Sequence, residues 1–97
     1  MRIVIIGAGK VGLKLAKQLS EENYDIVLVD HNEKKLKTAI DKLDIFCVEG
    51  DGANAEVQRE AGVSQADLVI ACASTDEFNM LTCLIARKLG ARHTIAG

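Results

Sequence analysis

Apolar and polar positions alternate in blocks along the chain, and these blocks predict five strands and four helices. Short apolar runs rich in β-branched residues are typical of strands buried on both faces of a parallel sheet. We expect strands at Ile3–Ile6, Ile26–Val29, Ile45–Val48, Asp67–Ala71 and Ala91–Ala96. Apolar residues recur at helical spacing between them and predict helices over Lys10–Glu22, Glu33–Leu43, Asn54–Ala61 and Asp76–Leu89.

Three glycines follow the first strand in the spacing G-x-G-x-x-G, at Gly7, Gly9 and Gly12. In this pattern the first glycine permits a tight turn, the second lets the backbone approach a pyrophosphate, and the third lets the helix pack close to the strand. The helix that follows also points its free N–H groups at this place. We therefore expect a bound nucleotide. The alternative is a glycine turn that only joins a strand to a helix.

The alternation of strands and helices with short connections predicts an α/β fold, a Rossmann-type doubly wound parallel sheet. Right-handed crossovers give the strand order 3-2-1-4-5, with the ligand over the carboxyl ends of strands one, two and four. Ninety-seven residues allow one domain, residues 1–97. A six-stranded dinucleotide fold would continue with a further helix and strand, so the predicted sheet is truncated after strand five.

Candidate ligand contacts begin inside the glycine loop, with Lys10 and Val11. The ammonium of Lys10 could reach a phosphate, although such a side chain is more often simply solvated. Asp30 ends the second strand, 18 residues beyond Gly12, about where the ribose-binding acid of a dinucleotide site stands. His31 lies beside this predicted ribose, and a turn role is its alternative.

The carboxylate of Asp30 also predicts which cofactor binds. It can accept hydrogen bonds from both ribose hydroxyls but repels a 2′-phosphate, and no arginine follows it. The sequence therefore favours NAD(H), allows ADP or ATP, and disfavours NADP(H).

Two further strand ends supply candidate contacts. Asp51 and Gly52 follow the third strand, where Asp51 could accept from an adenine amino group or could form an Asx turn with no ligand contact. Ala73, Ser74 and Thr75 follow the fourth strand with small side chains that leave room for a ligand. Ser74 and Glu77 also match a capping box for the last helix, which would explain them without a ligand.

Two helix surfaces have different expected roles. Lys34, Lys35 and Lys37 are interpreted as a solvated face. The last helix has one apolar stripe at Phe78, Leu81, Ile85 and Leu89 and further apolar residues, Met80 and Leu84, on another side. A helix that is apolar on more than one side is usually buried on more than one side. A homo-oligomer contact or a further chain segment could cover it.

Composition narrows the classes of function. The net charge is −2 with no basic block, so nothing suggests nucleic-acid binding. No apolar run reaches the length of a membrane span, so direct membrane insertion is not expected. The odd number of cysteines, three, suits reduced structural thiols rather than disulfides or a metal site. With only two histidines and no substrate pocket in view, we expect a nucleotide-binding module, which could be part of a longer protein, and no catalytic residues.

The sequence resembles the N-terminal nucleotide-binding domain of Trk-type (TrkA-like) potassium uptake proteins, also called KTN or RCK domains. The resemblance runs along essentially the whole chain. It rests on MRIVIIGAGKVG, VLVDHNEKKL, VEGDGAN and, most specifically, ASTDEFNMLTCLIARKLGARHTIA. Generic dehydrogenases share the glycine loop but not the last run.

The resemblance implies a non-enzymatic regulatory domain in the cytoplasm, peripheral to the inner face of the cell membrane. Its implied partners are a membrane potassium-translocating subunit, whose ion flux it gates, and further copies of itself in a dimer or larger ring. It implies that Gly7, Gly9 and Gly12 hold a diphosphate, that Asp30 takes the adenosine ribose, and that Asp51 and Ser74–Thr75 line the pocket. The rival interpretation is the cofactor-binding half of an NAD-dependent oxidoreductase.

Overall fold

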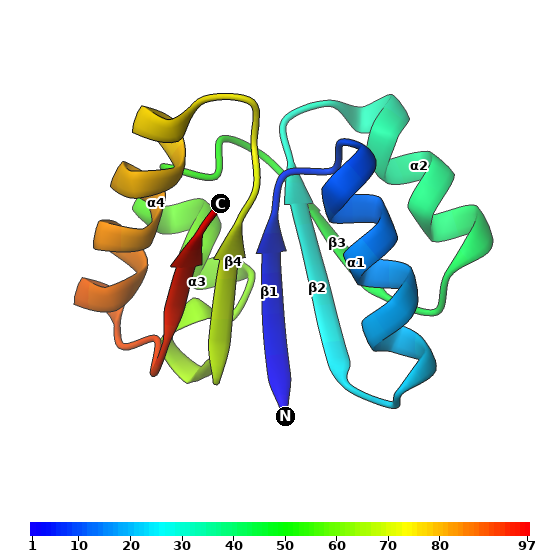
Figure 1. Ribbon diagram of the computed structural model, residues 1–97, viewed down its shortest axis with the longest axis horizontal. Helices are drawn as coiled ribbons and strands as arrows, with labels where there is room; N and C mark the ends of the chain where they lie inside the picture. The colour runs from blue at the N-terminus through cyan, green and yellow to red at the C-terminus, as the bar shows by residue number, and fades with distance from the viewer.

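The computed structural model describes residues 1–97, and its elements follow the predicted order (Figure 1). The strands are β1 (Arg2–Ile6), β2 (Asp25–Asp30), β3 (Phe46–Glu49), β4 (Leu68–Ala71) and β5 (Thr94–Ala96). The helices are α1 (Lys10–Glu21), α2 (Glu33–Lys42), α3 (Ala55–Glu60) and α4 (Asp76–Leu89), with a short 3-10 helix, η1, at Val63–Gln65. All strands pair in parallel in the order β3-β2-β1-β4-β5, which confirms the predicted Rossmann-type sheet.

The central strand β1 is buried on both faces. Ile3 and Ile5 belong to the core that α1 and α2 cover, whereas Val4 and Ile6 belong to the core on the side of α3, η1 and α4. Successive strand side chains point to opposite faces, so an unbroken apolar run supplies both cores at once. The sequence pattern therefore predicted the environment of β1 correctly.

Asparagine and glycine residues define several of the helix ends. The side chains of Asn32 and Asn54 accept hydrogen bonds from the first-turn amides of α2 and α3. Gly62 (φ +83°) and Gly90 (φ +114°) adopt the left-handed conformation after α3 and α4. The predicted capping box at Ser74 is wrong, because α4 begins at Asp76 and its cap is Thr75, whose hydroxyl accepts from the Phe78 amide.

Two helices have small residues on their inward faces. Helix α1 approaches the sheet through Gly12 and Ala16, whereas Val11 is 60% exposed. In α4 the buried residues are Asn79, Thr82, Cys83 and Ala86. Small and polar side chains therefore make the closest inner contacts of both helices, and the stripe residues Phe78 and Leu89 of α4 pack against the core beside them.

The large apolar side chains of α4 point outward. Met80, Leu81 and Leu84 are about half exposed or more, so the predicted grouping of Leu81 with the core-facing residues is wrong. With Cys83, Arg87, Thr94 and Ala96 they form a shallow groove between α4 and β5, here called the α4–β5 groove.

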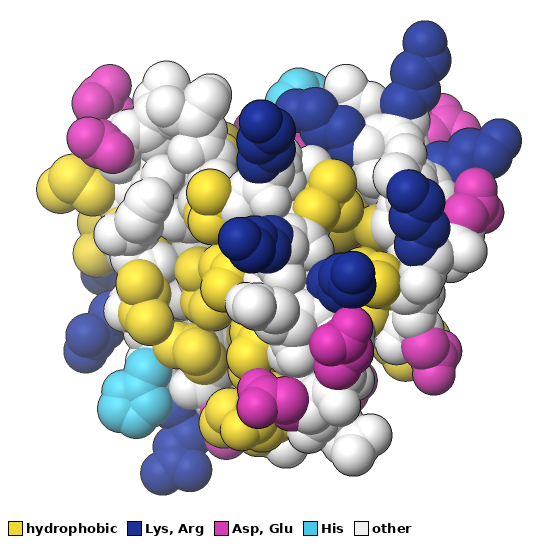
Figure 2. Space-filling view, turned by 45° about the vertical axis from the view of Figure 1, so that its right-hand side comes forward, with side chains coloured by type: hydrophobic (Ala, Val, Ile, Leu, Met, Phe, Trp, Pro, Cys, Tyr) yellow, Lys and Arg dark blue, Asp and Glu magenta, His cyan; other side chains and the backbone are white.

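The sheet is also incompletely covered near its β5 edge. Leu68 and Ile70 of β4 are half-buried on the α1 side, and Ile95 of β5 is exposed. Figure 2 shows hydrophobic side chains gathered on this part of the surface, while lysine and arginine side chains are spread singly over the helical part.

We predict that two glycines of one motif respond differently to alanine. A Cβ at position 12 would lie 1.7 Å from the carbonyl oxygen of Gly7, whereas a Cβ at position 9 would meet nothing within 4 Å. Gly12→Ala should lower the free energy of unfolding by about 1–3 kcal/mol, because backbone must shift to admit the methyl group. Gly9→Ala should cost less than about 1 kcal/mol, the size of a capping effect. Urea denaturation measures both, and equal losses would contradict the assigned packing.

Candidate functional site

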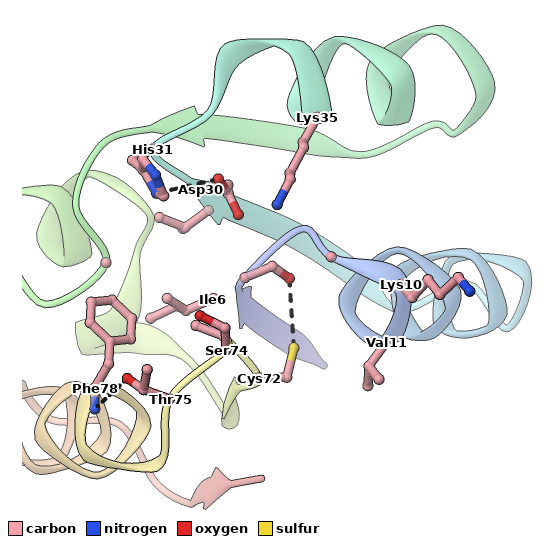
Figure 3. A pocket seen from close by; sticks show the side chains of 15 residues that line it. Ile6, Lys10, Val11, Asp30, His31, Lys35, Cys72, Ser74, Thr75 and Phe78 are labelled. Atoms are coloured by element: carbon pink, nitrogen blue, oxygen red, sulfur yellow. Dashed lines mark hydrogen bonds and ion pairs between the residues drawn. The ribbon is translucent and has the colours of Figure 1, made fainter.

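A cleft of about 410 Å³ opens at the carboxyl ends of β1, β2 and β4 (Figure 3). Its volume lies within the usual range for small-molecule sites, and its position is the one at which open α/β sheets bind ligands. Ten of the twelve residues singled out in the sequence line it: Gly7, Gly9, Lys10, Val11, Asp30, His31, Gly52, Ala73, Ser74 and Thr75.

The other two residues, Gly12 and Asp51, do not line the cleft. Gly12 has a packing role instead, because its missing side chain allows α1 to approach the Gly7 carbonyl. The Asp51 carboxylate accepts a hydrogen bond from the Ala53 amide at 2.9 Å, which is the Asx turn foreseen as the alternative. This turn presents Gly52, whose missing side chain is required because a Cβ there would lie 2.2 Å from the Ile6 side chain.

The glycine loop is fixed at its start and open at its centre. Gly7 turns with φ +118°, a conformation suited to glycine, and its amide donates to the Val29 carbonyl at 2.8 Å. A Cβ at position 7 would also lie 2.9 Å from the Ala73 nitrogen. Gly9, by contrast, borders open space in the cleft, so a ligand can approach its backbone closely.

The first turn of α1 has no side-chain cap. Gly9 occupies the capping position and no acidic residue lies in the first turn, whereas Asn32, Asn54 and Thr75 cap α2, α3 and α4. The leading amides of a helix need acceptors, and the positive end of the helix dipole favours an anion. In this cleft those amides are available to a phosphate, whereas the side chain of Lys10 extends away from the cleft along α1 (Figure 3).

The carboxylate of Asp30 joins two loops of the cleft. One oxygen accepts from the Ala8 amide at 2.7 Å and the other from the Asn32 amide at 2.8 Å, and the side chain is only 9% exposed. Each carboxylate oxygen has capacity for a further hydrogen bond, so both could still accept ribose hydroxyls. Asp30 thus fixes the glycine loop to the β2–α2 turn as well as facing the cleft.

Its neighbour His31 lies at the rim of the cleft. Its Nδ1 is 3.6 Å from Asp30 Oδ1, and its side chain is largely exposed. This places His31 beside the predicted ribose, at the edge of the site.

Cys72 lies under the glycine loop. Its thiol donates to the Gly7 carbonyl across 3.6 Å, and burial, reinforced by the negative charge of Asp30, raises the pKa of the thiol. A raised pKa keeps the group protonated, so it remains a donor to the loop at neutral pH. The three cysteines are unpaired in the structure.

Two buried side-chain amides form hydrogen bonds to the backbone of the loops that line the cleft. The Nε2 of Gln58 donates to the Gly52 carbonyl at 2.8 Å and to the Thr82 carbonyl at 3.1 Å. The side chain of Asn79 accepts from the Ala73 amide at 2.9 Å and donates to the Ala73 carbonyl at 3.2 Å. Helix α4 therefore fixes the Ala73 wall directly and reaches the Gly52 wall through Gln58.

Five lining residues were not predicted: Ile6, Val29, Lys35, Cys72 and Phe78. Ile6, Val29 and Cys72 lie at strand ends, so the rule that ligands bind at carboxyl ends could have identified them. Lys35 and Phe78 lie in the first turns of α2 and α4. Lys35 is exposed, as predicted for the solvated lysine face, and it also borders the cleft. Ser74 has no capping role, so its hydroxyl remains available to a ligand.

The parallel sheet, the glycine turn and the cleft at the strand ends define a Rossmann-type fold. The TrkA-N domain family matches residues 3–97, and the chain belongs to that family. It is 44% identical over 89 residues to the Trk system potassium uptake protein TrkA of Vibrio alginolyticus, covering 92% of this chain and 19% of that protein. The chain thus spans about a fifth of that relative's length.

Solved structures share the fold at lower identity. The Kef C-terminal domain of Shewanella denitrificans in its AMP-bound form superposes with a TM-score of 0.81 at 21% identity, over 98% of this chain and 57% of that one. The GsuK channel bound to NAD gives a TM-score of 0.78 at 20% identity, over 97% of this chain and 21% of the channel. None of the helices here combines the length and apolar character that a membrane crossing requires.

Proposed function

We propose that residues 1–97 form a nucleotide-sensing domain that binds NAD(H) in the cleft and regulates a potassium uptake system. The observation that carries this proposal is the pairing of the uncapped α1 terminus at Gly9 with the Asp30 carboxylate across one cleft. Amide donors for a phosphate and a carboxylate acceptor for the ribose hydroxyls, placed on one cleft, fit the two halves of an adenosine diphosphate unit.

In the proposed complex the diphosphate lies on the amides of the glycine loop, with Lys10 beside it. The Asp30 carboxylate accepts the adenosine ribose hydroxyls, and His31 lies at the same edge. The adenine ring lies near Gly52 and Phe78, where apolar side chains line the cleft. Asp51 acts through the turn that presents Gly52, and Ala73, Ser74 and Thr75 contact the rest of the ligand.

Charge decides the proposed order of affinities. Asp30 repels a 2′-phosphate, so NAD(H) should bind more tightly than NADP(H). Lys10 carries a single ammonium group and cannot bind a phosphate in the bidentate geometry of arginine. ADP and ATP are therefore secondary candidates. The AMP-bound Kef domain and the NAD-bound GsuK channel, which share this fold, support an adenine nucleotide in general.

The regulatory role follows from the family. The relatives that match this chain are named as potassium uptake proteins. We propose that the domain acts in the cytoplasm at the inner face of the membrane, where ligand exchange gates a membrane potassium-translocating subunit. A ligand can shift such an equilibrium only through its difference in affinity between two assembly states.

A binding role is favoured over an oxidoreductase. A dehydrogenase needs a proton donor beside the nicotinamide. The histidine of the cleft, His31, lies next to Asp30 at the adenosine end, and His93 lies outside the cleft. We therefore propose that the nucleotide is a signal and that no chemical step takes place on it.

The direct test is calorimetric titration of NADH, NAD⁺, ADP, ATP and NADPH into the wild type and into Gly9→Ala. We expect NAD(H) to bind tightest. Gly9→Ala should fold normally but bind NADH at least about tenfold more weakly, because its methyl group occupies the path of the diphosphate. A binding preference for ATP would reassign the ligand. No binding by the folded wild type, or unchanged binding by the variant, would contradict the proposed site.

Self-association is the second part of the proposal. The α4–β5 groove exposes Met80, Leu81 and Leu84 together, which is more than scattered single apolar residues would give. We propose that a second copy of the chain covers this groove, in a dimer or a larger ring.

A charge introduced into the groove should prevent this association. In sedimentation velocity we expect the wild type to be dimeric or larger and Leu84→Lys to shift to monomer. Ile40→Lys is the matched control, because Ile40 is similarly exposed but lies on α2, away from the groove. A monomeric wild type, or the same shift in both variants, would contradict the assignment.

A further inference from the structure

Lys35 lies on the cleft, although it belongs to the solvent-exposed lysine face of α2. It lines the site together with Asp30 and His31, and Figure 3 shows its side chain extending from α2 toward the Asp30 side of the cleft. Lys34 and Lys37 of the same helix do not line the site. The helix thus directs one lysine of its cluster at the ribose end of the cleft.

A chain of hydrogen bonds fixes the backbone from which Lys35 extends. The Asp30 carboxylate accepts from the Asn32 amide at 2.8 Å, and the Asn32 side chain accepts from the Lys34 amide at 2.9 Å and the Lys35 amide at 3.3 Å. The same carboxylate that faces the ribose therefore also fixes the turn that presents Lys35. The position of the Lys35 backbone relative to the Asp30 carboxylate is therefore set by the fold.

The ammonium of Lys35 is unpaired. The ion pairs of the structure join Arg2 with Asp25, Asp30 with His31, and Glu56 with Arg59, and none involves Lys35. It also lies in the first turn of α2, where the helix dipole adds positive potential. An anion placed beside Asp30 would therefore meet a cation that has no other partner.

We propose that Lys35 is a specificity-determining residue that binds a phosphate on the adenosine ribose. This inference rests on the proposed nucleotide site and deepens it. Dinucleotide sites that accept a 2′-phosphate place a cation near the adenosine ribose. Here no arginine follows Asp30 in sequence, but the fold supplies Lys35 five positions later. Lys35 offsets the repulsion by Asp30, so NADPH binds more weakly than NADH but is not excluded.

The test compares NADH and NADPH affinities in four proteins: the wild type, Lys35→Gln, Lys35→Arg and Lys34→Gln. Calorimetry gives each dissociation constant, and the ratio of the NADPH constant to the NADH constant is the readout. Lys35→Gln should raise this ratio about tenfold, the size of one exposed charge-assisted hydrogen bond, mainly by weakening NADPH. Lys35→Arg and Lys34→Gln should leave the ratio near the wild-type value. The effect of Lys35→Gln should shrink at high salt.

The possible outcomes distinguish a failure of the Lys35 assignment from a failure of the nucleotide site itself. If NADH binds the wild type but Lys35→Gln leaves the ratio unchanged, or Lys34→Gln changes it equally, the assignment of Lys35 is overturned and the nucleotide site stands. The same holds if NADPH fails to bind the wild type at concentrations that saturate NADH. If neither dinucleotide binds the folded wild type, the proposed nucleotide site fails, and the inference about Lys35 fails with it.

Discussion

The close approach of α1 to the end of β1 is the constraint on which the rest of the site depends. At Gly12 the helix lies so near the Gly7 carbonyl that no side chain fits between them. This contact places the first turn of α1 at the carboxyl edge of the sheet with its amides open to the cleft. Because the backbone sets the position, the phosphate end of the site needs few side chains of its own.

Asp30 fixes the β2–α2 turn relative to the glycine loop. Its carboxylate bonds the Ala8 amide of the glycine loop and the Asn32 amide of the next turn, so it connects the proposed phosphate and ribose ends. Removing the carboxylate would release both loops and also remove the ribose acceptor. Loss of binding in such a variant would not separate the two roles, whereas Gly9 and Lys35 each affect one ligand group.

The strand core and the glycine loop could be predicted from the sequence, because apolar runs and glycine spacing report directly on burial and turn geometry. The helix faces could be predicted only in part, since Phe78 and Leu89 of the apolar stripe do pack against the core. The inner contacts of α1 and α4 use Gly12, Ala16, Asn79 and Thr82, which lack the apolar signal of a core stripe. Lys35 was missed for a related reason, since the direction of a lysine within a solvated cluster depends on where the neighbouring loops lie.

The most direct test of the central claim is a nitrogen–proton correlation NMR titration of the labelled protein with NADH. Backbone amides report position, so the spectrum locates the ligand without any substitution. We expect the largest shifts at residues 7–11, 30–35 and 73–75, with the edge strand β3 little changed. Shifts confined to other surfaces, or no shifts at saturating NADH, would contradict a nucleotide site at the glycine loop.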